Sequence, residues 1–184
     1  MSGQENPWQR LGKSIVYDNP WFQVVDHEVI HPAGNPGVYG VVSFKNLAVG
    51  VIPLDDEDHT WLVGQFRFAL DEYSWEIPMG GVPRDTDPLV GAQRELKEET
   101  GLTAAKWQHI LSIRISNSVT DEAGVVFVAE DLTPGEPEPD DTEKLEIRRL
   151  PFDEAVRMAM DGEITDGLSV TGILKLAALR LLRD

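Results

Sequence analysis

Residues 94–101 read RELKEETG, and this short acidic stretch determines how the rest of the chain is interpreted. If the stretch is helical, Glu95, Glu98 and Glu99 lie at positions i, i+3 and i+4, so their side chains share one helix face. Like charges at these spacings each weaken a helix by roughly 0.2–0.5 kcal/mol. We therefore expect a partner that offsets this repulsion.

The sequence marks both ends of this helix. Asp87 has the side chain of an N-cap residue, and Pro88 suits the first helical position because its missing N–H has no partner there anyway. Gly101 is the residue type that ends a helix in a left-handed conformation. The pattern predicts a helix over residues 88–100.

The segments around this helix predict the fold class. Upstream, runs rich in Val, Ile and aromatic residues, broken by Asn-Pro, Gly and Asp, indicate strands within 14–30, 38–44, 47–54 and 59–68. Downstream, strands are predicted at 107–116, 124–132 and 145–150, and helices at 151–162 and 168–184. The last helix carries an apolar stripe, made of Val170, Ile173, Leu174, Ala177 and Leu181.

We expect an α+β fold, an α/β/α sandwich in which a mixed sheet is flanked by helices, with a small antiparallel sheet at the N-terminus. Residues 1–45 are predicted to form a separate small sheet and residues 46–184 the main domain.

Composition excludes several classes of function. The 184 residues include 32 acidic and 16 basic side chains, giving a formal net charge of -16 that disfavours a nucleic-acid polymer or an anionic membrane as partner. A polyphosphate substrate would need cations to mediate its binding to such a chain. Cysteine is absent, which excludes thiol catalysis and fits a reducing compartment, and the first residues lack the apolar segment of a secretory signal. We expect a soluble cytoplasmic protein.

Residues 80–102, GGVPRDTDPLVGAQRELKEETGL, resemble the Nudix box, G-x5-E-x7-R-E-U-x-E-E-x-G-U with U aliphatic. One position departs from the pattern, because Thr86 stands where the box has a glutamate that tends to contact its arginine. Asp85 and Asp87 are candidate substitutes. The wider chain resembles the ADP-ribose and nucleoside diphosphate sugar pyrophosphatases, through VGQFRF, WEIPMGG, SVTDE and LPFDEAVRMAMDGEITDG in the same order.

This resemblance implies a metal site. Carboxylates clustered near a phosphoryl substrate suit Mg²⁺, with Mn²⁺ as an alternative, and such an ion would offset the repulsion within the box. The implied metal ligands are Glu95, Glu98, Glu99 and the backbone carbonyl of Met79. Arg94, one turn before Glu98, is expected to hold that glutamate in place, and we count both among the catalytic residues.

The resemblance also implies residues that contact the substrate. Arg67 would hold a phosphate, a task suited to guanidinium, and Glu76 would reach metal or ribose. Tyr39 and Trp21 are candidates for stacking on a base, and Glu122 for reaching the substrate.

The water-activating base is expected on the acidic segment TPGEPEPDDTEK, where the resembling enzymes carry such a glutamate. Its offset from LPFDEA points to Glu143, with Asp141 and Glu146 as alternates.

The resemblance implies hydrolysis of the pyrophosphate bond of a nucleoside diphosphate sugar, either ADP-ribose or a nucleotide-activated hexose. It also implies a homodimer, in which residues 1–45 are the dimerisation sub-domain and residues 46–184 the catalytic domain. Residues 116–118 read SNS, where many ADP-ribose enzymes have SPG. Nucleotide-activated hexoses therefore remain possible substrates. Two alternatives remain: a MutT-type nucleoside triphosphate pyrophosphatase, and a non-catalytic Nudix-fold module that senses a nucleotide.

Overall fold

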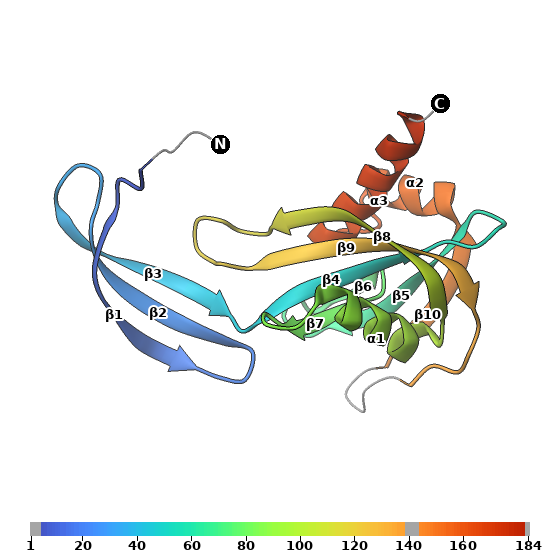
Figure 1. The fold of residues 1–184 in the computed structure, drawn as a ribbon, viewed down its shortest axis with the longest axis horizontal. Helices are drawn as coiled ribbons and strands as arrows, with labels where there is room; N and C mark the ends of the chain where they lie inside the picture. The colour runs from blue at the N-terminus through green and yellow to red at the C-terminus, as the bar shows by residue number, and fades with distance from the viewer. Residues whose placement is uncertain (1–4, 139–143, 183–184) are drawn as a thin grey trace. The chain divides into compact units, whose positions relative to one another are not determined.

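The structure, a computed structural model, describes residues 5–138 and 144–182. The chain divides into two compact units (Figure 1). The N-terminal unit comprises Met1–Asn46 with the loop Ser116–Glu122, and the main unit comprises Leu47–Ile115 with Ala123–Asp184.

The N-terminal unit is an antiparallel sheet in the order β1-β2-β3, formed by β1 (Gln9–Asp18), β2 (Phe22–Ile30) and β3 (Pro36–Phe44). The predicted segment 14–30 spans two strands because a turn begins at Asn19, whose side-chain oxygen accepts hydrogen bonds of 2.8 Å from the N–H groups of Trp21 and Phe22. The loop Ser116–Glu122 joins this unit through β3, where the Val42 N–H donates to the Val119 carbonyl at 2.9 Å.

The main unit contains two sheets. The first has the order β7-β4-β9-β8 and is mixed, since β4 runs parallel to β9 and β9 runs antiparallel to β8. The second has the order β10-β5-β6 and is antiparallel throughout. The strands are β4 (Asn46–Pro53), β5 (His59–Arg67), β6 (Glu72–Glu76), β7 (Met79–Pro83), β8 (Thr103–Arg114), β9 (Ala123–Thr133) and β10 (Glu146–Pro151).

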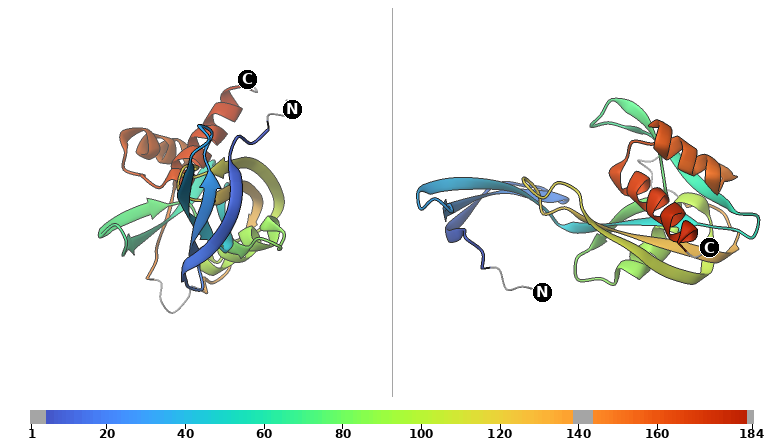
Figure 2. Two further views of the ribbon diagram at one scale, coloured as in Figure 1. Left: turned by 90° about the vertical axis from the view of Figure 1, so that its left-hand side faces the viewer. Right: turned by 90° about the horizontal axis from the view of Figure 1, so that it is seen from above.

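Helices cover both faces of the main unit, as Figures 1 and 2 show. The alternation of side chains along a strand explains this arrangement. Val51 packs in the cluster that includes Leu96 of α1 (Pro88–Thr100), whereas its neighbour Ile52 packs in the other cluster, with α2 (Phe152–Asp161) and α3 (Gly167–Leu181). Burial of Leu96, which is fully shielded from solvent, contributes about 1.5–3 kcal/mol to the free energy of unfolding.

The predicted fold class is confirmed, and so are the ends of α1. The Asp87 carboxylate accepts a hydrogen bond from the Leu89 N–H at 3.0 Å, Pro88 is the first helical residue, and Gly101 ends the helix with φ 74°. The Gly101 N–H donates to the Lys97 carbonyl at 2.8 Å, which completes the C-terminal cap.

Two strands escaped prediction, β6 and β7, and one predicted core residue is wrong. Gly80, Gly81 and Pro83 make β7 a poor strand by composition, so only its pairing with β4 holds it in the sheet. Leu181, assigned to the apolar stripe, is 78% exposed at the end of α3, whereas the other four residues of the stripe lie in or against the core. The buried residues of α3 are Leu168, Ser169, Gly172, Ile173 and Leu176.

Within the described ranges, no helix combines the length and hydropathy that crossing a membrane requires.

The buried hydroxyl of Thr60 on β5 provides a test of how an unpaired polar group affects the stability of the core. Thr60 is 1% exposed, and its Oγ1 has no hydrogen-bond partner among the residues that the structure describes. Thr60→Val replaces this hydroxyl with a methyl group of the same shape and removes the unpaired polar atom. We expect the free energy of unfolding to rise by about 1 kcal/mol and the melting temperature by about 2–4 °C, measured by calorimetry.

Thr100→Val is the matched control. The Thr100 hydroxyl is also buried, but it donates to the Leu96 carbonyl at 2.6 Å and accepts from the Leu102 N–H at 3.2 Å. This substitution should therefore lower the melting temperature. If both variants lose stability, the Thr60 hydroxyl contributes a favourable interaction after all.

Candidate active site

The helix face that carries the Nudix-box glutamates is turned into the protein. Glu95 is 8% exposed and Glu99 is 2% exposed, whereas the Glu98 side chain keeps 37% of its surface accessible. Charged carboxylates are rarely buried without partners, because desolvation of an unpaired charge costs several kcal/mol or more. The contacts of this face therefore define the site.

Arg94 offsets part of the repulsion within the cluster. Its Nη1 donates to Glu98 Oε2 at 2.8 Å, and its Nη2 donates to Glu95 Oε1 at 2.5 Å and to the Gly81 carbonyl at 3.0 Å. The guanidinium is thus fixed by three oxygen atoms even though Thr86 stands at the departing box position. Asp87 does not substitute there, because its carboxylate caps α1.

The third carboxylate is held by the turn that precedes β7. Glu99 Oε2 accepts a hydrogen bond of 2.9 Å from the Met79 N–H, which joins the helix face to the backbone. Gly80 follows this contact, and an added Cβ there would overlap the Glu95 carboxylate. Only glycine leaves room for the Glu95 carboxylate in its present position beside this turn.

Arg67 and Glu76 form an ion pair across the hairpin of β5 and β6. Arg67 Nε donates to Glu76 Oε1 at 2.8 Å, its Nη2 bonds Glu76 Oε2, and Glu76 is only 2% exposed. This bonding raises the pKa of the Arg67 guanidinium, although partial burial opposes the rise. The nearby charges of Asp166 and Glu99 raise the pKa further, so Arg67 stays protonated.

Asp166 escaped prediction as a member of this cluster. It caps α3, and its Oδ2 accepts hydrogen bonds of 2.8 Å from both the N–H and the hydroxyl of Ser169. The signal for the cap was present in residues 166–169, DGLS, since Asp is a favoured N-cap residue whose side chain accepts a hydrogen bond from an N–H of the first turn. Its proximity to Arg67 depends on tertiary structure and has no sequence signal.

The acidic segment after β9 returns to α1. The Glu138 N–H donates to the Glu98 carbonyl at 2.8 Å, and the Lys97 ammonium pairs with the Glu138 carboxylate at 3.1 Å. Glu143 and its alternate Asp141 lie outside the described residues. The other alternate, Glu146, opens β10, where its Oε2 accepts a hydrogen bond of 3.0 Å from the Tyr73 hydroxyl.

Three predicted substrate contacts belong to the N-terminal unit: Tyr39, Trp21 and Glu122. Tyr39 lines a pocket of about 310 Å³ together with Trp8, and its hydroxyl donates to the Ser118 carbonyl at 2.5 Å. Trp21 is 67% exposed in the turn between β1 and β2. The Glu122 N–H donates to the Thr120 hydroxyl at 3.2 Å.

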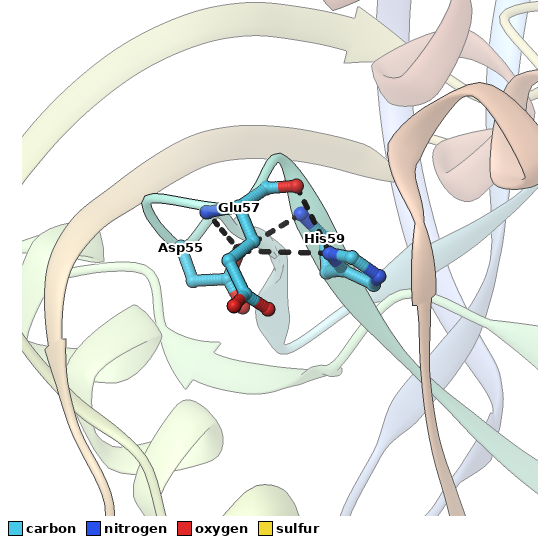
Figure 3. Close-up of side chains that lie close together, drawn as sticks. All are labelled: Asp55, Glu57 and His59. Atoms are coloured by element: carbon cyan, nitrogen blue, oxygen red, sulfur yellow. Dashed lines mark hydrogen bonds and ion pairs between the residues drawn. The ribbon is translucent and has the colours of Figure 1, made fainter.

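A second acidic cluster lies at the turn between β4 and β5 (Figure 3). Asp55, Glu57 and His59 form the only group of three potential metal ligands in the described ranges whose ligand atoms all lie within 4.8 Å. Arg149 Nη2, however, donates to Asp55 Oδ2 at 2.5 Å and to Glu57 Oε2 at 2.6 Å. This guanidinium supplies the positive charge, and the network ties the turn to β10.

The Asp55 cluster is remote from the box glutamates along β5. His59 begins this strand and Arg67 ends it, which separates them by roughly 26 Å at about 3.3 Å per residue. By contrast, Glu95 and Glu98 share the Arg94 guanidinium, and Glu99 accepts the Met79 N–H.

Two family models match this chain. The NUDIX domain model covers residues 44–167, and the model of the nucleoside diphosphate sugar hydrolase N-terminal domain covers residues 8–42. The chain belongs to the Nudix family and is a Nudix hydrolase.

Curated relatives and a solved structure agree with this assignment. This Nudix hydrolase is 34% identical over 165 residues to the ADP-ribose pyrophosphatase of Bacillus subtilis, with 89% of each chain covered. It is 29% identical over 174 residues to the CMP-5'-(N-acetyl-N-hydroxy-3-aminopropyl)phosphonate hydrolase of Streptomyces rubellomurinus, covering 94% of this chain and 83% of the relative. The crystal structure of an ADP compounds hydrolase shares the fold, with a TM-score of 0.84 at 22% identity over 97% of this chain and 96% of that one.

The residues of the box fit a divalent cation. Glu95, Glu98 and Glu99 are hard oxygen donors on one helix face, and the Gly80 backbone approaches them where no side chain has room. Arg94 pairs with Glu95 and Glu98, and Glu99 accepts the Met79 N–H, so the three carboxylates are held near the start of β7. Carboxylate oxygens are the donors that Mg²⁺ prefers.

The short distance between the Gly80 backbone and the Glu95 carboxylate can be tested by substitution. Gly80→Ala places a methyl group where the Glu95 carboxylate lies, so this side chain must move away from the turn. We expect hydrolytic activity to fall at least about tenfold, as when a supporting contact of a metal site is lost. Gly167→Ala is the control, since an added Cβ there meets no atom within 4 Å. Equal kcat/KM in the two variants would show that Glu95 can shift without consequence.

Proposed function

We propose that this Nudix hydrolase uses Mg²⁺, or Mn²⁺ in its place, to hydrolyse the pyrophosphate bond of a nucleoside diphosphate sugar. Water attacks one phosphorus, the bridging P–O bond breaks, and the products are a nucleoside monophosphate and a sugar phosphate. When bound, the metal would neutralise the diphosphate and activate the attacking water.

The observation that carries this proposal is the buried carboxylate face of α1. Glu95 and Glu99 are almost fully shielded from solvent, and Glu99 is bonded to the backbone of the Met79 turn. Such a site concentrates negative charge where a diphosphate must bind, and like charges repel unless a cation lies between them. We assign Glu95, Glu98, Glu99 and the Met79 carbonyl as metal ligands, with Arg94 holding Glu98.

The substrate class rests on the comparisons. One relative is named for ADP-ribose and another for a CMP-linked phosphonate, and both names denote a nucleotide joined to a second group. The N-terminal match to nucleoside diphosphate sugar hydrolases points the same way. We propose ADP-ribose or a nucleotide-activated hexose as the substrate and the cytoplasm as the location.

The remaining residues receive proposed roles. Arg67, kept protonated and oriented by Glu76, is suited to contact a substrate phosphate. Tyr39, Trp21 and Glu122 of the N-terminal unit are proposed to contact the base or sugar. Glu143 remains the proposed base that takes the proton of the attacking water.

A nucleotide panel tests the proposal. The protein is incubated with Mg²⁺ and either ADP-ribose, nucleotide hexoses or nucleoside triphosphates, and the released phosphomonoesters are measured. We expect nucleoside diphosphate sugars to be cleaved, and a chelator to stop the reaction until Mg²⁺ or Mn²⁺ is added back. Glu99→Gln should lower kcat at least about a hundredfold, on the order of losing one electrostatic stabiliser, while Glu130→Gln, an exposed change on β9, should not.

Each alternative predicts a different result. Preference for nucleoside triphosphates would indicate a MutT-type enzyme, and binding without cleavage would indicate a sensing module. Cleavage that persists in the presence of the chelator would refute the metal-dependent proposal.

We also propose that the protein is a homodimer that pairs through the N-terminal sheet. Every residue of β1 except Gly12 is exposed, including the large apolar side chains of Leu11, Ile15, Val16 and Tyr17. A strand with this many exposed large apolar side chains is a candidate association site.

Light scattering at micromolar concentration tests the assembly, and we expect a mass twice the 20.5 kDa of one chain. Ile15→Glu puts a charge into the proposed interface and should shift the mass toward the monomer. Met160→Glu is the control, because Met160 is 69% exposed on α2, outside that sheet. A wild-type protein that is monomeric under these conditions contradicts the proposed dimer.

A further inference from the structure

The Ser169 hydroxyl is the most deeply buried polar group near the candidate active site. Ser169 is fully shielded from solvent in the first turn of α3. Its hydroxyl donates to Asp166 Oδ2 at 2.8 Å and accepts a hydrogen bond of 3.0 Å from the Ile77 N–H. The hydroxyl therefore links the cap of α3 to a backbone group that lies 92 positions away in the sequence.

Ile77 lies between the two parts of the site. Glu76, the residue before it, pairs with Arg67, and Met79, two residues after it, donates its N–H to Glu99. The carbonyl of the intervening Pro78 accepts a hydrogen bond of 2.8 Å from the Val51 N–H on β4. The turn from Glu76 to Met79 is thus fixed at three points, by α3, by β4 and by α1.

The three hydrogen bonds that hold this turn connect it to different elements. The Val51 contact holds the turn against the sheet, and the Met79 contact depends on Glu99, itself a proposed metal ligand. Ser169 ties the Ile77 N–H of this turn to α3, an element outside both the sheet and the helix of the box glutamates. Because Asp166 accepts from both the Ser169 N–H and hydroxyl, the serine oxygen is oriented with its lone pair toward Ile77.

We propose that Ser169 is a positioning residue of the metal site: through Ile77 it sets the path of the turn that brings the Met79 backbone against the box glutamates. This inference rests on the proposed metal site. Ser169 lies beyond residues 44–167, the part of the chain that matches the Nudix domain model. A purely structural serine would affect stability, whereas a positioning serine also affects metal affinity.

Two substitutions remove the link in different ways. Ser169→Ala deletes the hydroxyl, and Ser169→Cys keeps most of the volume but offers a thiol, which is a weak hydrogen-bond acceptor. Mn²⁺ binding is measured calorimetrically without substrate, and the binding that disappears in Glu99→Gln defines the signal from this site. We expect both serine variants to bind Mn²⁺ at least about tenfold more weakly, within the range for lost supporting hydrogen bonds.

Two controls on α3 separate positioning from general damage. Thr171→Ala also removes a hydroxyl, one that bonds only the Gly167 carbonyl among the described contacts, at 2.7 Å. Leu176→Ala removes a side chain that is 8% exposed in the core and should lower the melting temperature. Both controls should bind Mn²⁺ as the wild type does at temperatures below their melting transitions.

The outcomes are distinct. Wild-type affinity in both serine variants overturns the inference, whatever happens to their melting temperatures. So does an equal loss of affinity in Leu176→Ala, because it would show that instability alone weakens the site. A wild-type protein without Mn²⁺ binding at Glu99 overturns both the metal site and this inference. A wild-type protein that binds Mn²⁺ but cleaves no nucleotide refutes only the proposed activity, since the binding comparison still stands.

Discussion

The burial of negative charge on one face of α1 is the constraint on which the rest of the main unit depends. Glu95 and Glu99 are both less than 10% exposed, and buried carboxylates destabilise a fold unless hydrogen-bond donors reach them. The protein supplies an arginine from the same helix and the backbone N–H of Met79, the first residue of the preceding strand, β7. Gly80, beside that N–H, lets the chain pass close to the Glu95 carboxylate. The burial of the carboxylates therefore explains both the position of β7 and the glycine in the box.

Local chemistry explains why much of this could be predicted. The ends of α1 follow from the cap at Asp87, the ring of Pro88 and the left-handed Gly101, all within a single element. The spacing of the box glutamates likewise places them on one helix face without knowledge of the fold. The strands of the N-terminal sheet were visible for the same reason, since β-branched and aromatic residues alternate with clear turn signals.

Features that depend on pairing between distant segments could not be predicted. Strand β7 contains two glycines and a proline, and it is recognisable only beside β4. The loop Ser116–Glu122 belongs with the N-terminal strands because of backbone bonds to Val42, for which no sequence pattern exists. The predicted stripe of α3 lies in or against the core except at Leu181, because periodicity gives the buried side of a helix but not how far along the helix burial extends.

The hydrogen bond between Ser169 of α3 and the Ile77 N–H also affects where the C-terminal boundary of the Nudix unit should be placed. A family match that stops at residue 167 suggests a natural place to cut the chain for transfer into another protein. Such a fragment would lose nearly all of α3, including Ile173 and Leu176 of the larger core, and it would leave the Ile77 N–H buried without its acceptor. The boundary of sequence similarity and the boundary of independent folding therefore differ here by one whole helix, and a transplanted unit should keep that helix.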